Sequence, residues 1–168
     1  METEANRVRL LLLSPERRLL MFKHRHLRPD GVEEPSWVTI GGGREPGETI
    51  EQTALRELAE ETGMTGVALG PVVWYGEDHH RSAPWGRIHR ELFILAEAPD
   101  ETLDTSGWTD GECEDIMETR WWTLDAIRAS DEVIFPVGLA DLLAPLLAGE
   151  IPHEVRVLPP LHRDAESR

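Results

Sequence analysis

The stretch Gly42–Met64, GGREPGETIEQTALRELAEETGM, decides how this chain folds, because it joins a glycine-rich turn to the clearest helix in the sequence. Apolar and polar residues after the turn recur with the period of about 3.6 residues that is typical of an amphipathic α-helix. Thr49 is a suitable N-cap with Gln52 as its capping-box partner, and Gly63 can adopt the left-handed conformation that ends a helix. The sequence therefore predicts a helix over residues 50–62.

The predicted helix has an acidic side and an apolar side. At about 100° per residue, the acidic side consists of three glutamates: Glu57, Glu60 and Glu61. The apolar side consists of four residues: Ile50, Ala54, Leu55 and Leu58. Like charges three or four residues apart cost a helix roughly 0.2–0.5 kcal/mol per pair unless cations lie between them. Because Mg²⁺ prefers oxygen ligands and often bridges carboxylates to substrate phosphates, we expect divalent cations here.

Three consecutive glycines, Gly41, Gly42 and Gly43, stand before this helix. Glycine lets the backbone approach a ligand closely, and the amide groups at the start of a helix attract anions. A negatively charged phosphate compound is therefore the kind of ligand that this turn favours.

The spacing of these residues resembles the signature box of the Nudix hydrolases. Gly42 is followed after five residues by Glu48 and after seven more by RELAEETGM, residues 56–64. This resembles G-x5-E-x7-R-E-U-x-E-E-x-G-U, where U is a bulky aliphatic residue, at every defined position. Weaker motifs extend the resemblance over residues 8–147, although family members often carry proline where this chain has Ile40.

The resemblance implies an α/β fold, the Nudix α/β/α sandwich with a mixed β-sheet. Independently, the patterns predict strands at 8–13, 19–24, 37–40, 67–75, 88–96 and 120–124, and further helices at 124–129 and 137–147. Residues 81–86 would close a hairpin, and residues 99–118 are expected to form a polar, acidic loop. We expect one domain over residues 1–150 and a partly disordered C-terminal tail over residues 151–168.

The resemblance also implies a metal centre that holds Mg²⁺, with Mn²⁺ as the alternative. Its ligands would be the carboxylates of Glu57, Glu60 and Glu61 and the carbonyl of Gly41, for which the Gly42 carbonyl is an alternative. Glu57, Glu60 and Arg56 would be catalytic, with Arg56 orienting the glutamates. A bound divalent cation polarises phosphoryl oxygens and lowers the pKa of water, which suits hydrolysis at phosphorus.

Many Nudix enzymes use one more glutamate from outside the box. The acidic segment offers Glu112, Glu114, Asp115 and Glu118. We favour Glu112 because related proteins carry a glutamate eight residues before the Arg-Trp-Trp sequence that begins at residue 120.

The substrate implied by the resemblance is a nucleoside diphosphate linked to another moiety. A nucleoside triphosphate, a nucleotide-sugar and an ADP-ribose-like compound all meet this description. Contacts with it are expected from Gly42, Gly43 and Glu48, and from Trp85, whose ring in the 81–86 loop could stack on a nucleobase.

Two other functions share the fold. A non-catalytic Nudix domain that senses a nucleotide is the main alternative, and the intact box favours catalysis over it. An isomerase of the isopentenyl diphosphate type needs an active-site cysteine in its own motif, whereas Cys113 lies in the acidic segment.

Composition narrows the partners. The 168 residues include 17 basic and 32 acidic ones, and the resulting net charge of −15 repels nucleic-acid backbones and anionic membranes. Cys113 has no partner for an internal disulfide, and the apolar run at 8–13 is interrupted by Arg9 and too short to span a membrane. We therefore expect a cytoplasmic protein with a small nucleotide substrate and no general nucleic-acid or membrane binding, and the resemblance favours a homodimer.

Overall fold

The computed structural model describes residues 4–26, 31–80 and 87–163 of the chain. It contains eight strands: β1 (Arg7–Leu13), β2 (Leu19–His24), β3 (Ser36–Thr39), β4 (Leu69–His80), β5 (Arg87–Glu97), β6 (Ile116–Trp122), β7 (Arg156–Val157) and β8 (Leu161–Arg163). It also contains four helices: α1 (Ile50–Thr62), α2 (Asp110–Asp115), α3 (Leu124–Ala129) and α4 (Leu139–Leu147).

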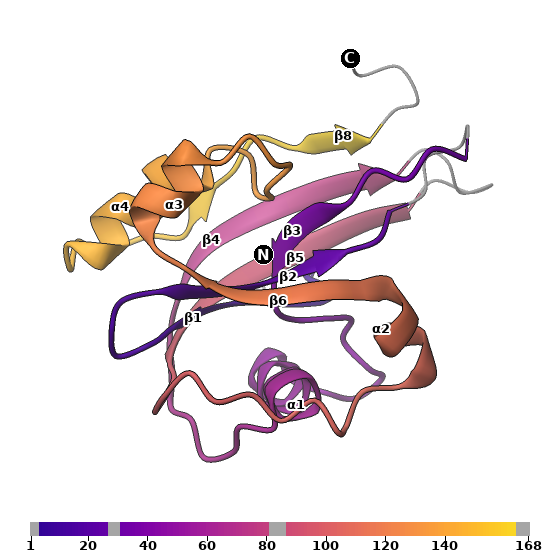
Figure 1. Cartoon of the computed structure of the whole chain (residues 1–168). Helices are drawn as coiled ribbons and strands as arrows, with labels where there is room; N and C mark the ends of the chain where they lie inside the picture. Colours follow the sequence, from indigo (N-terminus) through magenta and orange to yellow (C-terminus); the bar gives the residue numbers. More distant parts are fainter. Residues whose placement is uncertain (1–3, 27–30, 81–86, 164–168) are drawn as a thin grey trace.

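The sheet lies between two helical layers, with α1 on one side and α3 and α4 on the other (Figure 1). The strand order is β3-β2-β1-β5-β4-β7, with β6 paired to β2 and β8 paired to β4. Strands β1 and β5 are parallel, whereas β1 and β2, and also β4 and β5, are antiparallel. The α/β/α sandwich with a mixed sheet is confirmed.

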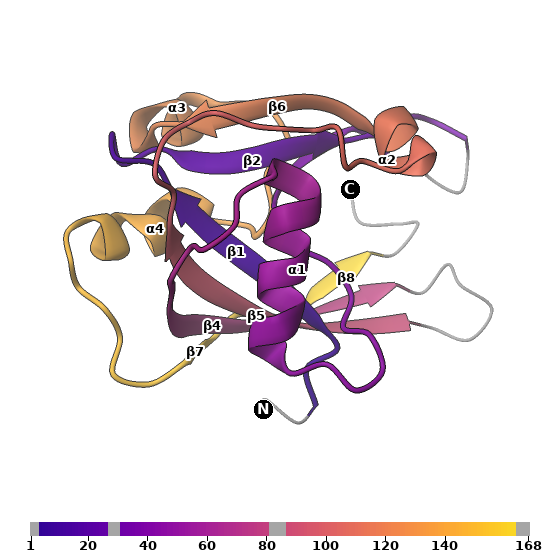
Figure 2. The same ribbon diagram turned by 90° about the horizontal axis from the view of Figure 1, so that it is seen from below.

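Strand β2 leaves β1 soon after the turn that joins them. The two strands pair where Leu13 lies opposite Leu19, and β2 then runs between β3 and β6 (Figure 1). Helix α1 lies over β1 (Figure 2). The chain that follows β3 returns to β1, because the N–H groups of Val8 and Leu10 donate to the carbonyls of Gly42 and Ile40 at 3.0 and 2.8 Å. The glycine-rich turn is therefore held at the centre of the sheet, next to α1.

Strand β1 is apolar on both faces because both are covered. Val8, Leu10 and Leu12 belong to the core beneath α1, whereas Leu11 and Leu13 belong to the core beneath α3 and α4. Alternate side chains of a strand point to opposite faces, so one nearly continuous apolar run serves two cores.

Both predicted ends of α1 are confirmed. Thr49 and Gln52 form a capping box, and Gly63 ends the helix with a φ of 74°. The loop that carries Asp104 then lies against this end, where the Asp104 N–H donates to the carbonyl of Thr62 at 2.9 Å.

The assignment of faces to α1 was wrong for three residues. Leu55 is 42% exposed, whereas Glu57 and Glu61 are buried. Seven and eleven residues are close to two and three full helical turns, so Glu57 and Glu61 lie about 20° to either side of Ile50, in the middle of the buried face. Two carboxylates are thus placed where α1 meets the sheet.

The acidic segment is more ordered than the sequence analysis expected. Residues 110–115 form α2, which begins with a capping box between Thr109 and Glu112, and β6 begins at Ile116 rather than Arg120. The spacing of Thr109 and Glu112 is the local signal that could have indicated this helix. The predicted 81–86 loop, with Trp85, lies outside the described residues.

Residues 151–163, which the sequence analysis set apart as a tail, run back to β4. Strand β7 is parallel to β4, with Arg156 opposite Trp74, and β8 follows with Leu161 opposite Asp78. In the part of the chain that the structure describes, no helix is both long and apolar enough to cross a membrane.

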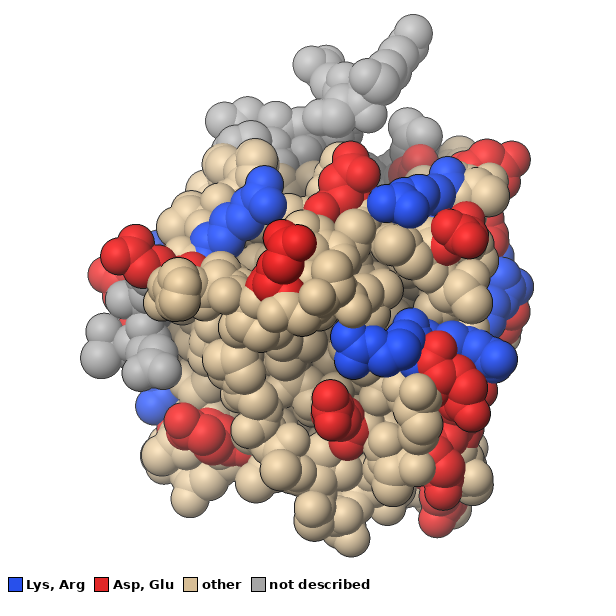
Figure 3. Space-filling model, turned by 90° about the vertical axis from the view of Figure 1, so that its left-hand side faces the viewer, with Lys and Arg blue, Asp and Glu red and all other residues tan. Residues whose placement is uncertain are grey.

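The β1–β2 turn is tied to its surroundings by two arginines. Arg17 donates to the carbonyl of Leu147 in α4 at 2.9 Å, and Arg18 pairs with Glu101 at 3.1 Å. On this side of the molecule, basic and acidic side chains lie near one another around an uncharged middle region (Figure 3).

Replacing Gly63 by alanine should destabilise the protein by about 2 kcal/mol or more. The left-handed conformation costs an L-residue roughly 1–2 kcal/mol, and the added Cβ would lie 2.6 Å from Cβ of Asp104. Gly47 is the matched control because it has a φ of +87° but nothing within 4 Å of a built Cβ. Urea unfolding should give a larger loss for Gly63→Ala than for Gly47→Ala, and equal losses would contradict a role for the Asp104 contact.

Candidate active site

Arg56 is the centre of the acidic cluster on α1. Its Nε and Nη2 atoms donate to the two carboxylate oxygens of Glu48 at 2.7 and 2.9 Å, a bidentate pair. Its Nη1 donates to Glu57 at 2.8 Å and to Glu60 at 3.2 Å, and Nη2 also reaches the carbonyl of Gly43 at 2.9 Å. One guanidinium therefore joins the turn before the helix to two glutamates of the acidic side.

The carboxylate of Glu48 is held by Arg56 and is strongly ionised. Hydrogen bonds from Arg56, and also from the Glu45 N–H and Thr53 Oγ1, lower the pKa of Glu48 to about 2. The side chain is therefore a firmly ionised anchor for the guanidinium, and its predicted contact with substrate stays a prediction.

Glu61 faces the glycine-rich turn. Its carboxylate accepts a hydrogen bond from the Gly41 N–H at 2.7 Å, and its backbone carbonyl accepts one from Trp108 Nε1 at 2.9 Å. The carbonyl of Gly42 is occupied by the N–H of Val8 in β1. Of the two carbonyls considered as metal ligands, that of Gly41 is therefore the one we keep.

The turn also lies very close to Glu57. A Cβ built on Gly42 would come within 2.3 Å of Glu57 Oε1, so any side chain at position 42 would displace the carboxylate. The first glycine of the sequence motif is thus needed because the backbone passes directly over a glutamate of the same motif.

The two buried glutamates hold their protons unusually tightly. Burial raises the pKa of Glu57 even though Arg56 donates to it. Burial raises the pKa of Glu61 to about 8, against the opposing hydrogen bond from Gly41, and the neighbouring charge of Glu57 adds to the rise. A divalent cation would relieve this accumulation of negative charge, and the donors are all oxygens of the kind that Mg²⁺ and Mn²⁺ prefer.

The carboxylates of the cluster do not converge on one point where a metal ion could bind. Within the described residues, no three His, Cys, Asp or Glu side chains are gathered closely enough to hold a metal ion. Arg56 holds oxygens of Glu57 and Glu60, and Gly41 holds Glu61. Glu57, Glu60 and Glu61 could hold a cation if these oxygens exchanged their present hydrogen-bond partners.

Glu112 lies near the cluster but has a structural contact of its own. Its carboxylate accepts from the backbone N–H and the hydroxyl of Thr109 at 2.7 and 2.8 Å, as the cap of α2. Its charge also contributes to the raised pKa of Glu61. Glu118, another candidate in this segment, pairs with Arg120 at 2.7 Å.

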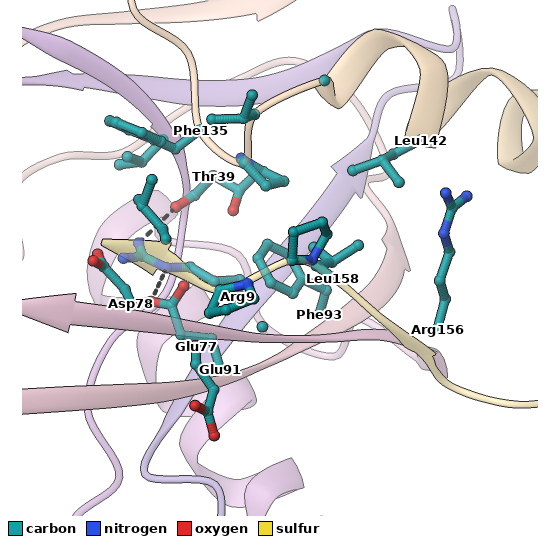
Figure 4. A pocket seen from close by; sticks show the side chains of 18 of the residues that line it. Arg9, Thr39, Glu77, Asp78, Glu91, Phe93, Phe135, Leu142, Arg156 and Leu158 are labelled. Carbon is teal, nitrogen blue, oxygen red and sulfur yellow. Dashed lines mark hydrogen bonds and ion pairs between the residues drawn. The ribbon is translucent and has the colours of Figure 1, made fainter. Parts of the chain in front are cut away.

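A pocket of about 480 Å³ opens on the face of the sheet opposite α1 (Figure 4). Its polar lining includes Arg9, Thr39, Asp78 and Glu91, and its apolar lining includes Phe93, Phe135, Leu142 and Leu158. Thr39 stands two residues before Gly41, so one short segment connects the pocket to the glutamate cluster. Pockets of this size with an apolar lining and a few polar groups are typical of small-molecule sites.

A buried ion pair forms the polar end of this pocket. Arg9 Nε donates to Glu91 at 2.8 Å, and Arg9 Nη1 donates to the carbonyl of Thr39 at 3.0 Å. Burial alone would lower the pKa of Arg9 and raise that of Glu91, but their proximity reverses both shifts, so both groups are charged. This pair holds the end of β3 against β1 and β5.

The sequence analysis did not identify the pocket. It noted Arg9 only as an interruption of an apolar strand, although Glu91 stands directly before the apolar run 92–96 of another predicted strand. Two opposite charges within buried strands were the available signal, since buried charges require partners. Their pairing depends on β1 lying beside β5, which sequence spacing does not reveal. The predicted ligand Trp85 lies outside the described residues.

Comparisons with known proteins match one family over most of the chain. The NUDIX domain family model matches residues 3–140. The "Oxidized purine nucleoside triphosphate hydrolase" of Danio rerio is 31% identical over 137 residues, which cover 77% of this chain and 76% of the relative.

Two solved structures show the same fold. The E. coli dihydroneopterin triphosphate pyrophosphohydrolase has a TM-score of 0.59 at 19% identity, with 85% of this chain and 94% of that chain covered. The NUDIX domain of Shewanella oneidensis NrtR, complexed with ADP ribose, has a TM-score of 0.58 at 18% identity, with 88% and 90% covered.

The raised pKa of Glu61 makes the stability of the metal-free protein depend on pH. A carboxyl whose pKa rises from 4.5 to about 8 on folding stabilises the protein fully below pH 4.5, and this contribution is lost as the pH rises through about 8. We expect the thermal midpoint of the metal-free protein to fall between about pH 6 and pH 9, and Glu61→Gln to remove most of this fall.

The exposed Glu51 on the same helix provides the matched control. Glu51→Gln should retain the pH dependence of the unchanged protein. An equal fall for the unchanged protein and for Glu61→Gln would show that Glu61 is not the group responsible.

Proposed function

The chain belongs to the NUDIX family, and from this premise we propose that it is a Mg²⁺-dependent pyrophosphohydrolase that cleaves a nucleoside triphosphate by attack of water at phosphorus. More broadly, its substrates are nucleoside diphosphates linked to another moiety. Mn²⁺ is the alternative cation.

The arrangement around Arg56 is the observation that carries this proposal. Arg56 is anchored by Glu48 and donates to Glu57, Glu60 and the Gly43 carbonyl, which positions these glutamates beside the glycine-rich turn. A cluster of like charges is unfavourable by itself, and Arg56 supplies only one positive charge to several carboxylates. The cluster is therefore best explained as a site for a divalent cation, which prefers oxygen ligands.

The burial of each glutamate suggests its role in the proposed reaction. Glu57 and Glu61 are buried, which suits them to hold a cation at a fixed place. The side chain of Glu60 is 50% exposed and has a long contact of 3.2 Å with Arg56, so it is the member that can face the substrate and accept a proton from water. When bound, Mg²⁺ would polarise the phosphoryl oxygens of the substrate.

The phosphates of the substrate would lie along the glycine-rich turn. Gly43 leaves room for the backbone to approach them, because nothing lies within 4 Å of a Cβ built on it, and the predicted contact with Gly42 stays a prediction. We keep Glu112 as the proposed catalytic residue outside the box, because it is close enough for its negative charge to raise the pKa of Glu61.

The pocket on the other face of the sheet would hold the nucleoside. Its apolar end suits the faces of an aromatic base, and its charged end suits the polar edge of the base. The Danio rerio relative is named for oxidized purine nucleoside triphosphates, which favours a purine nucleotide as the substrate to test first.

Two further parts of the sequence-based interpretation stay predictions. They are the cytoplasmic location of the protein and its assembly as a homodimer.

Glu60→Gln should lower kcat for a purine nucleoside triphosphate by a factor of about 10² or more, because acid–base groups contribute roughly 10²–10⁴ to a rate. Its melting temperature should equal that of the unchanged protein, since Glu60 is exposed. Glu51→Gln, which removes the same charge elsewhere on α1, should keep full turnover. Products are measured chromatographically with Mg²⁺ and with Mn²⁺.

Full turnover by Glu60→Gln would show that the assignment of the cluster is wrong. If the unchanged protein cleaves none of the nucleoside triphosphates, nucleotide-sugars and ADP-ribose, yet one of them raises its melting temperature, the nucleotide-sensing alternative replaces hydrolysis.

A further inference from the structure

The C-terminal strap, defined as residues 156–161, runs along the outer edge of the sheet beside β4. Arg156 and Val157 lie opposite Trp74 and Tyr75, and the Leu158 N–H donates to the carbonyl of Tyr75 at 2.8 Å. Leu161 then lies opposite Asp78. Residues 159 and 160 are prolines, which have no N–H to donate. The strap therefore pairs with β4 before and after the two prolines.

The strap forms one wall of the pocket described above. The lining residues that it supplies are Arg156, Leu158, Pro159, Pro160 and Leu161. Leu158 is buried and belongs to the same core cluster as Trp74 and Phe93, and its side chain lies beside Phe93 at the pocket (Figure 4). Val157, its neighbour in the strap, is 63% exposed.

Gly76 leaves an opening in β4 directly beneath this wall. A Cβ built on Gly76 would lie 3.5 Å from Phe93 Cε2 and 3.8 Å from Leu158 Cδ1, which are ordinary contacts. Glycine in a strand interior is unfavourable and often marks the close approach of a ligand. Gly76 lines the pocket, so any side chain longer than that of alanine would enter the space between Phe93 and Leu158.

We propose that Leu158 of the C-terminal strap and Gly76 of β4 determine which nucleotide base the pocket accepts, with Leu158 closing one side of the space and Gly76 providing its depth. This inference rests on the proposed function. The base would lie against Phe93 and Leu158, and a purine would use the depth over Gly76 that a pyrimidine leaves empty. The C-terminal segment thereby becomes a specificity element of the enzyme.

Two substitutions should change the specificity in different ways. Gly76→Leu fills the pocket and should raise KM for a purine nucleoside triphosphate about tenfold or more, with a smaller effect on a pyrimidine nucleoside triphosphate. Leu158→Ala widens the pocket and should lower the purine-to-pyrimidine ratio of kcat/KM about tenfold. Neither residue belongs to the glutamate cluster, so kcat at saturation should change little in either variant.

A graded substitution and a matched control accompany these variants. Gly76→Ala adds a group with ordinary contacts only, and Val157→Ala shortens an exposed side chain of the same strap. Val157→Ala should keep the KM values of the unchanged protein, and Gly76→Ala should raise KM for the purine nucleotide less than Gly76→Leu does. Urea unfolding identifies folded variants, and if Leu158→Ala does not fold, Gly76→Leu alone decides.

Binding without turnover separates this inference from the proposed function. Guanosine 5′-monophosphate is titrated calorimetrically into the metal-free protein, with inorganic pyrophosphate as the probe that lacks a base. If the protein cleaves no nucleotide but binds the monophosphate, and Gly76→Leu weakens that binding about tenfold, hydrolysis fails and the inference stands. If the protein cleaves purine nucleotides and folded Gly76→Leu keeps the unchanged KM, the inference is overturned.

Discussion

Arg56 lies among carboxylates that would repel one another without it. Its guanidinium binds both oxygens of Glu48 and reaches Glu57 and Glu60, so a single positive charge connects the turn to two turns of α1. An arginine suits this position because its planar, rigid group of donors matches several carboxylate oxygens at once. The direction of the glutamates depends on this contact, which also adds a bond to the Gly43 carbonyl in a turn that β1 already holds.

The sheet brings a second functional region next to this cluster. Because β2 separates from β1, the chain after β3 can return to β1 and bond to its edge. Successive residues of this segment then contact opposite faces of the sheet. Thr39 contributes to the pocket on one face, while two residues later Gly41 holds Glu61 on the other. A nucleotide that spans both regions would therefore be bound by residues from one short, fixed segment.

Local interactions explain which predictions were accurate. Helix α1 was predicted to the residue because Thr49, Gln52 and Gly63 lie within the segment that they delimit. The same kind of signal, a Thr and a Glu three residues apart, was present for α2 but was overlooked in an acidic segment. The burial of Glu57 and Glu61 required the whole helix to be docked, because an isolated helix does not show which side faces the sheet.

The sequence by itself determined the family, the glycine turn, the helix and the identity of the acidic cluster, because all of these are encoded in 23 consecutive residues, Gly42–Met64. Only the tertiary structure decided the pocket, which combines β1, β4 and β5 with α4 and the C-terminal strap. Arg9 and Glu91 are 82 positions apart, and Gly76 and Leu158 meet only because β7 and β8 run beside β4. Contacts between distant segments depend on chain topology, which residue spacing within any one segment does not record.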